Sequence, residues 1–457
     1  MISKFASEPC LARIEPPEQP LSLFRLLQAV VSNPIKAWPP AVYRERLYRW
    51  RVLGQDTVYV MAPDLIRTVL LENADDFEKG EITRRALGPG LGDSILIANG
   101  LRWRWQRRAV AALFRPERIR EFVPEMIAAA ERTRDRWQAM PPGAEIDVAH
   151  EMMLTTFDVI LRTMLPGRGG IDTELMERSV TSGLESASWI VALALVRAPS
   201  WVPYPGIYRT HRDRKRVRSI LESLILEARR TPGKSDDLLS HLMNATDPQT
   251  GKPMNAVDIR NNLMTFITAG HETTALALTW TFYLLSLHPA VEERVRGEIA
   301  AVTGGGPVRP NHVDGLIYTN QVIQESMRLY PPAALIARAA RRDIVLDNEH
   351  IRAGTTVYVP VYAVHRHEKL WNEPNRFDPS RFEPEAAKAL DRFCYLPFGA
   401  GPRTCIGLNF AQMEAMAVTA SLLRSFQLKL RPDYSPEPQL RVTLRPAGGM
   451  PMRLQRL

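Results

Sequence analysis

The chain has 457 residues, a formal net charge of +9, 45% hydrophobic residues and three cysteines, a composition ordinary for a globular enzyme. The cysteines form no C-x-x-C pair and no zinc-type spacing, which argues against a disulfide scaffold and a structural zinc site. The longest wholly apolar run, residues 189–196, is well short of the ~20 residues that span a bilayer. We therefore predict a cytoplasmic protein without a transmembrane anchor.

Helical patterns dominate the chain, and strand-like runs are short. Residues 56–61 and 355–361 are strand candidates rich in β-branched and aromatic residues, and Pro360 places the second near a strand end or at a sheet edge. Helices are predicted over residues 63–72, 116–140, 151–164, 212–230, 290–302 and 313–330. Without a linker or a regular strand–helix alternation, the expected fold is mainly α with small β-sheets. A leading arm over residues 1–35 would precede one large catalytic domain over residues 36–457.

Positive charge concentrates between residues 101 and 120, where seven arginines are opposed only by Glu117. Such a segment could face nucleic acid, a membrane surface or an acidic protein. No known reader motif accompanies it, so we expect no nucleic-acid partner, while a solvated helix face remains an open alternative. Within it, Trp103 and Arg107 lie one helical turn apart and offer an indole N–H and a guanidinium.

The most informative helix is predicted to begin near Asn255, with Asp258 as a capping partner, and to stop at His288-Pro289. At about 32 residues it would be roughly 48 Å long, enough to cross the molecule. It is apolar on most faces, as a central buried helix should be.

Midway along this helix, residues 269–274 read AGHETT. Gly270 weakens the helix locally, and threonine hydroxyls can bond to a carbonyl one turn back, so a groove for a diatomic ligand and water is one interpretation. The alternative is structural: glycine for close packing, threonine paired with backbone, and Glu272 paired with an arginine.

Residues 398–407 read FGAGPRTCIG and open directly onto a helical pattern over residues 406–426. Cys405 therefore lies at or just before a helix N-terminus, where the macrodipole and free N–H groups favour a thiolate. Arg403, two residues earlier, could pair with an anionic group at the edge of a flat ligand. The alternative is a buried structural cysteine.

This loop resembles the haem-ligand loop of the cytochrome P450 superfamily, F-x-x-G-x-R-x-C-x-G. Every fixed position is matched, at Phe398, Gly401, Arg403, Cys405 and Gly407. Residues 269–274 are similar to the oxygen-groove motif of the same superfamily. Residues 325–328 (ESMR) and 379–382 (PSRF) resemble its Glu-x-x-Arg helix and its downstream Pro-x-Arg-Phe.

The resemblance implies a cytochrome P450 fold that holds haem b between the long central helix and the cysteine loop. Cys405 would be the iron ligand, Thr273 would hydrogen-bond bound dioxygen, and Glu272 would be its acidic partner in proton delivery. His271 is given no role on the iron. The remaining haem contacts implied are Trp103, Arg107, Arg338, Arg403, Phe398 and Ala269. Glu325, Arg328 and Arg381 would form a buried charge triad.

By the same resemblance the protein is a soluble, bacterial-type haem-thiolate monooxygenase. It would use O2 and take electrons from NAD(P)H through an acidic ferredoxin-type carrier and its reductase. Residues 94–97, 266–270 and 333–336 would line a pocket for a hydrophobic small molecule, and residues 186–208 its access region. A terminal hairpin is expected over residues 442–454. A peroxide-driven or isomerising relative, or a haem-binding sensor without turnover, remains an alternative.

Overall fold

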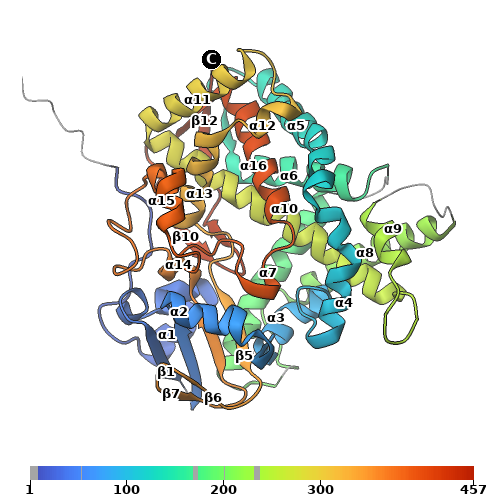
Figure 1. The fold of residues 1–457 in the computed structure, drawn as a ribbon, viewed down its shortest axis with the longest axis vertical. Helices are drawn as coiled ribbons and strands as arrows, with labels where there is room; N and C mark the ends of the chain where they lie inside the picture. Colours follow the sequence, from blue (N-terminus) through green and yellow to red (C-terminus); the bar gives the residue numbers. More distant parts are fainter. Residues whose placement is uncertain (1–8, 53, 168–172, 200, 231–236) are drawn as a thin grey trace, which may run out of the picture.

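The computed structural model describes residues 9–52, 54–167, 173–199, 201–230 and 237–457, which form a mainly helical domain with small sheets (Figure 1). The helices of the N-terminal half are α1 (Leu23–Ser32), α2 (Pro63–Arg67), α3 (Glu81–Leu91), α4 (Gly100–Val110), α5 (Pro116–Ala139), α6 (Val148–Met164), α7 (Thr173–Leu195), α8 (Ile207–Arg230) and α9 (Leu238–Asn244). Those of the C-terminal half are α10 (Ala256–Leu287), α11 (Pro289–Thr303), α12 (Pro310–Val313), α13 (Ile317–Leu329), α14 (Val361–Val364), α15 (Pro384–Ala389) and α16 (Leu408–Leu423).

The strands are short. They are β1 (Leu47–Val52), β2 (Gln55–Val60), β3 (Phe77–Glu78), β4 (Glu145–Asp147), β5 (Ile336–Ala340), β6 (Ile344–Leu346), β7 (Glu349–Ile351), β8 (Thr356–Val359), β9 (Phe426–Leu430), β10 (Pro438–Leu440), β11 (Leu444–Pro446) and β12 (Pro451–Arg456). Short 3-10 turns span Pro34–Ala37, Pro40–Tyr43, Ala74–Asp76, Ala111–Phe114, Pro379–Phe382 and Gly401–Arg403, and Thr68–Glu72 continues α2 as a π-helical turn.

The long helix α10 runs through the middle of the molecule, close to α16 (Figure 1). Its start is capped as predicted, because the side chain of Asn255 accepts a hydrogen bond from the backbone N–H of Asp258 at 2.9 Å. It ends at Leu287, directly before His288 and Pro289. The capping pair and the proline stop in the sequence therefore set both ends of the central helix.

The largest sheet has the strand order β1-β2-β8-β5-β3 and lies at the lower edge of Figure 1. Strand β8 runs parallel to β2 and antiparallel to β5, so it lies inside the sheet. Pro360 follows its last residue, which confirms the strand-end alternative over the edge alternative. The β5–β8 pairing places Arg338 opposite Val357, and the β3–β5 pairing brings Glu78 opposite Ala339.

The C-terminal segment differs from the predicted single hairpin over residues 442–454. Strand β11 pairs back with β10, whereas β12 joins a separate sheet between β4 and β9. Gly448 and Gly449, with φ of 78° and 86°, turn the chain between β11 and β12. The hairpin is therefore one strand earlier than expected.

Two helix boundaries also differ from the sequence analysis. Helix α13 begins at Ile317 instead of residue 313, because the separate turn α12 ends at Val313 and Gly315 follows it. Helix α16 ends at Leu423, and Phe426, predicted to be helical, is the first residue of β9.

The leading arm packs against the rest of the chain from residue 12 onward. The hydroxyl of Tyr330 donates to the Ala12 carbonyl at 2.7 Å, and the N–H of Ile14 donates to the Tyr362 hydroxyl at 3.2 Å. Helix α1 shares a buried apolar cluster with Ala192 of α7. The boundary at residue 35 therefore stays a prediction about domain organisation, while the packing is continuous across it. Among the described residues, none of the helices combines the length and apolar character that crossing a bilayer requires.

Candidate active site

A cavity of about 1000 Å³ lies between α10, β5 and the loop that precedes α16. Cys405 lines it from the loop, and Ala269 and Thr273 line it from α10. Much of the rest of its wall is apolar, with Phe266 and Ile336 among the lining side chains. The cysteine loop and the central helix are thus brought together around one space, as the sequence predicted.

The loop that carries Cys405 is shaped by a glycine and closed by a backbone hydrogen bond. Gly401 has φ +71°, and a Cβ there would lie 1.8 Å from the carbonyl oxygen of Leu70, so only glycine fits. The N–H of Cys405 donates to the Phe398 carbonyl at 2.9 Å. This turn presents the sulfur three residues before the first residue of α16.

Cys405 keeps exposed surface where it lines the cavity, but protein atoms surround it on most sides. Burial in this space raises its pKa, whereas the Gly407 N–H and the charge of Arg107 act in the opposite direction. The predicted helix-terminus effect is therefore present but outweighed. A thiolate at this position needs further positive charge, such as a metal ion bound to the sulfur.

Among the cationic side chains that line the same cavity, four matter for the argument: Lys79, Arg107, Arg338 and Arg403. Burial, followed by the charge of Arg403, lowers the pKa of Arg338 to about 10. Burial and the charge of Arg107 lower the pKa of Arg403 to about 10, opposed by Glu78. Burial, Arg338 and Arg403 together hold the pKa of Lys79 well below its ordinary value. So much cationic character with little counter-charge fits a ligand carrying more than one acidic group, as haem does with its two propionates.

Lys79 was missed by the sequence analysis because no motif marks it. It follows β3, and the pairing of β3 with β5 carries it towards Arg338. Only the sheet register brings these two cations to one cavity.

Trp103 has two arginines close to its ring. The guanidinium carbon of Arg403 lies 4.4 Å from the centroid of the indole ring, and that of Arg107 lies 5.9 Å from it. Arg403 also donates to the Ala98 carbonyl at 2.8 Å and to Oδ1 of Asn99 at 3.1 Å. The structure thus brings together the predicted pair, Trp103 and Arg107, and adds Arg403 to it.

Residues 269–274 do not interrupt α10, which is helical throughout. The hydroxyls bond one turn back as predicted, Thr273 to the Ala269 carbonyl at 2.8 Å and Thr274 to the Gly270 carbonyl at 3.3 Å. Gly270 serves close packing, because a Cβ there would lie 2.6 Å from Cδ1 of Ile160 on α6. The packing alternative is therefore supported for Gly270, while its place in the wall of the large cavity leaves the groove interpretation a prediction.

Glu272 is buried and faces the C-terminal hairpin. Its Oε1 accepts a hydrogen bond from the hydroxyl of Thr443 at 2.6 Å and forms an ion pair with Arg445. The alternative of a glutamate paired with an arginine is confirmed, and the partner lies 173 residues away. His271 is buried with its Nδ1 2.6 Å from the Ile267 carbonyl and its ring edge-on to Phe157. It is absent from the described lining of the large cavity.

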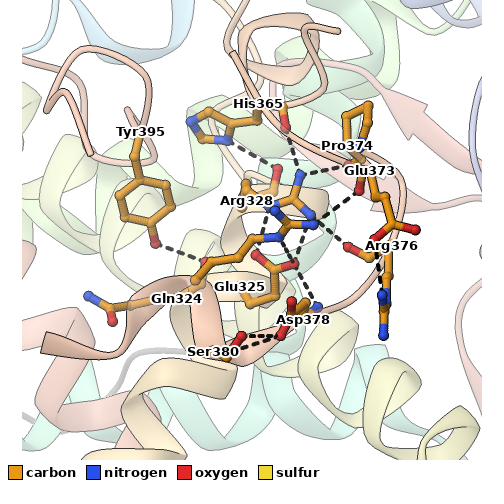
Figure 2. A network of polar contacts seen from close by, with 11 residues as sticks. Gln324, Glu325, Arg328, His365, Glu373, Pro374, Arg376, Asp378, Ser380 and Tyr395 are labelled. Carbon is orange, nitrogen blue, oxygen red and sulfur yellow. Dashed lines mark hydrogen bonds and ion pairs between the residues drawn. The ribbon is translucent and has the colours of Figure 1, made fainter. Parts of the chain in front are cut away.

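The predicted charge triad is formed, and Figure 2 shows two of its members, Glu325 and Arg328. Arg328 donates to both oxygens of Glu325 at 2.6 and 2.7 Å, and neither side chain is exposed. Arg328 also donates to the carbonyls of His365, Pro374 and Arg376 at 2.7–2.8 Å. The third member is held more loosely, with Nε of Arg381 3.5 Å from the carboxylate.

His365 connects this network to the cysteine loop and was not foreseen. Its Nδ1 lies 3.1 Å from the Arg328 carbonyl, and its Nε2 accepts the N–H of Leu396 at 2.7 Å. Burial, with the charge of Arg328, lowers the pKa of His365 to about 3, so the ring is neutral. The imidazole therefore holds the start of the loop against α13.

More arginines of the basic segment between residues 101 and 120 are paired with acids than its sequence suggested. Arg102, Arg104, Arg118 and Arg120 form ion pairs with acids from other parts of the chain or from the next helical turn. Arg108 and Arg115 are exposed and form no ion pair with a described residue. Glu117 is thus not the only opposing acid, and the free positive surface is correspondingly small.

The predicted substrate pocket is lined in part as expected. Of the expected ranges, the cavity wall includes Ile95, Leu96, Phe266, Thr268, Ala269, Gly270, Ala333, Leu335 and Ile336. Ile97, Ile267 and Ala334 are instead packed in the interior. From the access region, Ala187, Ser188, Val191 and Arg197 reach the cavity.

Comparison with known proteins gives the family. The family model described as Cytochrome P450 matches residues 16–451. The chain is 33% identical over 384 residues to a cyclooctat-9-en-7-ol 5-monooxygenase of Streptomyces melanosporofaciens, covering 82% of this chain and 81% of that protein. It is 31% identical over 409 residues to the cyclooctatin synthase of the same organism, covering 87% of each. It is 30% identical over 433 residues to a cytokinin hydroxylase of Arabidopsis thaliana, covering 91% and 81% respectively.

A match over this much of the sequence, on a helical fold with a cysteine loop facing the central helix, leaves one conclusion. The chain belongs to the cytochrome P450 family and is a haem-thiolate monooxygenase that uses O2.

Proposed function

We propose that this P450 inserts one oxygen atom from O2 into a C–H bond of a hydrophobic small molecule, with electrons from separate carrier proteins. The observation that supports it best is the shared cavity. One space of about 1000 Å³ is lined by a cysteine thiol, a cluster of cations and a threonine hydroxyl on the central helix. These are the groups needed for an axial ligand, for propionates and for proton transfer.

In this proposal Cys405 is the iron ligand. Arg338, Arg403 and Lys79 would hold the propionates together with the pair formed by Trp103 and Arg107, and Phe398 and Ala269 would contact the haem. When bound, the haem supplies oxygen activation, and the overall balance is O2, substrate C–H, two electrons and two protons giving alcohol and water.

The remaining steps fall to the side chains of the chain itself. The hydroxyl of Thr273 now donates to the Ala269 carbonyl, and rotation would turn its O–H bond into the cavity, where it could donate a hydrogen bond. Glu272, the neighbouring residue, is a buried acid held by Thr443 and Arg445, and it would supply a proton to the hydroxyl. An acid and an alcohol at consecutive positions of the helix supply the groups of a proton relay, which a passive haem carrier does not need.

The substrate class follows from the apolar wall. Phe114 and Phe266 stack with ring centroids 5.7 Å apart, and both line the cavity. An apolar compound is stabilised there by roughly 25 cal/mol for each Å² removed from water. The named substrates of the relatives, a cyclooctat-9-en-7-ol and a cytokinin, differ from each other, so the relatives support small-molecule oxidation without selecting one compound.

Exposed Arg108 and Arg115 support an acidic ferredoxin-type carrier, which would receive electrons from NAD(P)H through its reductase. The described cysteines, Cys10, Cys394 and Cys405, are all free thiols, which supports a reducing, cytoplasmic setting.

Two variants test the assignment. Cys405→Ser should abolish the Soret band typical of the reduced carbon monoxide complex, and its retention would mean that another residue binds the iron. Thr273→Ala should divert oxygen consumption into peroxide, and unchanged coupling would remove Thr273 from the proton relay. Turnover with peroxide but with no reductase system would favour a peroxygenase. Substrate-induced spectral shifts without turnover from any donor would favour a sensor.

A further inference from the structure

The large cavity carries more positive charge than two propionates can neutralise. Besides the four cations assigned to the propionates, four further arginines belong to its wall: Arg51, Arg197, Arg352 and Arg441. The acidic side chains of the described lining are Asp56 and Glu272, and Glu272 is already paired with Arg445, which is outside that lining. Asp56 alone therefore faces the four further arginines, and most of their charge is left for another acidic group.

Three of these arginines gather around α1, at the outer end of the cavity. Trp50, beside Arg51 on β1, packs against the buried apolar cluster that α1 shares with α7. Arg197 lies two residues beyond the end of α7, and Arg441 donates to the Val31 carbonyl of α1 at 2.8 Å. Because Arg51 and Arg197 are both exposed, the cavity opens to solvent here, and this opening is called the entrance below.

The arginines of the entrance have little counter-charge from the protein. Nε of Arg51 lies 3.4 Å from the carboxylate of Asp56, which Arg49 also approaches at 3.7 Å, so two arginines share one acid. Arg197 has no acidic partner among the described residues. Guanidinium groups that are exposed and incompletely paired can bind a carboxylate through two parallel N–H donors.

Behind the entrance the wall is largely apolar. Val30 of α1, Leu87 of α3, Val191 of α7 and Leu335 belong to it, and the same space reaches Cys405. An apolar body gains free energy from burial against such side chains, whereas a charged group would lose its hydration there. The compound that suits both parts of the cavity has an apolar body and one acidic end.

We propose that the substrate is an apolar carboxylic acid, and that Arg51 and Arg197 determine this specificity by holding its carboxylate at the entrance. The apolar chain then extends along the wall towards Cys405. The inference rests on the proposed oxidation of a hydrophobic small molecule and names the class of that molecule.

The test titrates the haem-loaded enzyme with dodecanoate and with dodecanol, which have the same chain and differ in the charge of one end. The low-to-high-spin shift of the haem reports binding of each compound. Dodecanoate should bind at least about tenfold more tightly than dodecanol, the gain expected of one hydrogen bond between charged groups. Dodecyltrimethylammonium, with the opposite charge, should bind more weakly than either.

Two variants assign the effect to the entrance. Arg51→Gln and Arg197→Gln should each lower the affinity for dodecanoate about tenfold and leave the affinity for dodecanol unchanged. Arg51→Lys keeps the charge without the paired donors and should give an intermediate affinity. The control is Arg46→Gln, which removes an exposed arginine just before β1 that pairs with Asp64 and Asp347 and is outside the described lining. It should change neither affinity.

The outcomes separate the substrate class from the proposed function. Equal binding of dodecanoate and dodecanol, or unchanged dodecanoate binding in R51Q and R197Q, would overturn the inference and leave oxidation of uncharged compounds standing. An equal loss of affinity for both compounds would make the arginines structural and would also overturn it. A complete spin shift with dodecanoate but no oxidised product with any electron donor would contradict the proposed function and leave the recognition of the carboxylate intact.

Discussion

Replacing Glu325 with glutamine tests the buried charge network of Figure 2. The variant keeps the shape of the side chain but leaves the guanidinium of Arg328 without its counter-charge, in a site where neither side chain is exposed. The two hydrogen bonds at 2.6 and 2.7 Å are charge-assisted, each worth about 1.5–3 kcal/mol. Removing one partner of a fully buried pair costs about 3–5 kcal/mol. We expect the free energy of unfolding to fall by that amount.

The network also predicts an order among its members. Arg328→Met should cost more than E325Q, because three carbonyls lose their donor and Glu325 is left as a buried anion. Arg381→Met should cost the least, since its contact with the carboxylate is 3.5 Å long and its side chain is 14% exposed.

Equilibrium urea unfolding, followed by circular dichroism, measures these differences. The matched control is Glu385→Gln, because Glu385 and Lys388 have the same i, i+3 spacing but side chains that are 87% and 72% exposed. That change should cost less than about 1 kcal/mol. If E325Q is no more destabilising than E385Q, or if Arg381→Met costs more than Arg328→Met, the reasoning from burial is wrong.

Three further changes extend the argument to the site. Gly401→Ala should lower the amount of haem bound per polypeptide, because the new Cβ would lie 1.8 Å from the Leu70 carbonyl oxygen. The control is Gly448→Ala, which should leave the haem content unchanged, because Gly448 also has a positive φ, +78°, but no atom lies within 4 Å of its Cβ position. Arg338→Gln should weaken haem binding in a titration. The haem-free variant should be as stable as the wild type or more stable, because the change removes a buried cation whose pKa is lowered by burial. A less stable haem-free variant would contradict this. His365 has a pKa of about 3 in the folded protein, against about 6.5 in the unfolded chain. Between these two pH values the unfolded chain binds more protons than the folded protein. The free energy of unfolding therefore falls as pH drops through this range, by at most about 1.4 kcal/mol per pH unit. His365→Gln should unfold with a shallower dependence on pH there, and an unchanged slope would show that the histidine does not set it.

The sequence by itself determined the features whose signals are local. The glycine turn before Cys405, the cap and proline stop of α10, and the backbone hydrogen bonds of Thr273 and Thr274 each depend on residues within a few positions. Periodicity and turn chemistry report such short-range structure well. The family motifs added the partners of Glu325, which local patterns alone do not give.

Only the tertiary structure decided which distant groups meet. The ion pair of Glu272 with Arg445 joins residues 173 positions apart, and Lys79 reaches Arg338 through a sheet register that no periodicity predicts. His365 joins α13 to the cysteine loop. Arg102 and Arg120 of the basic segment form ion pairs with acids far away in the sequence, Asp258 and Asp314. The pKa of Cys405 rises for the same reason, because burial is a property of the packed molecule. Charge pairing and desolvation depend on which segments pack against one another in the fold. Those contacts are determined by the whole sequence and not by a local pattern.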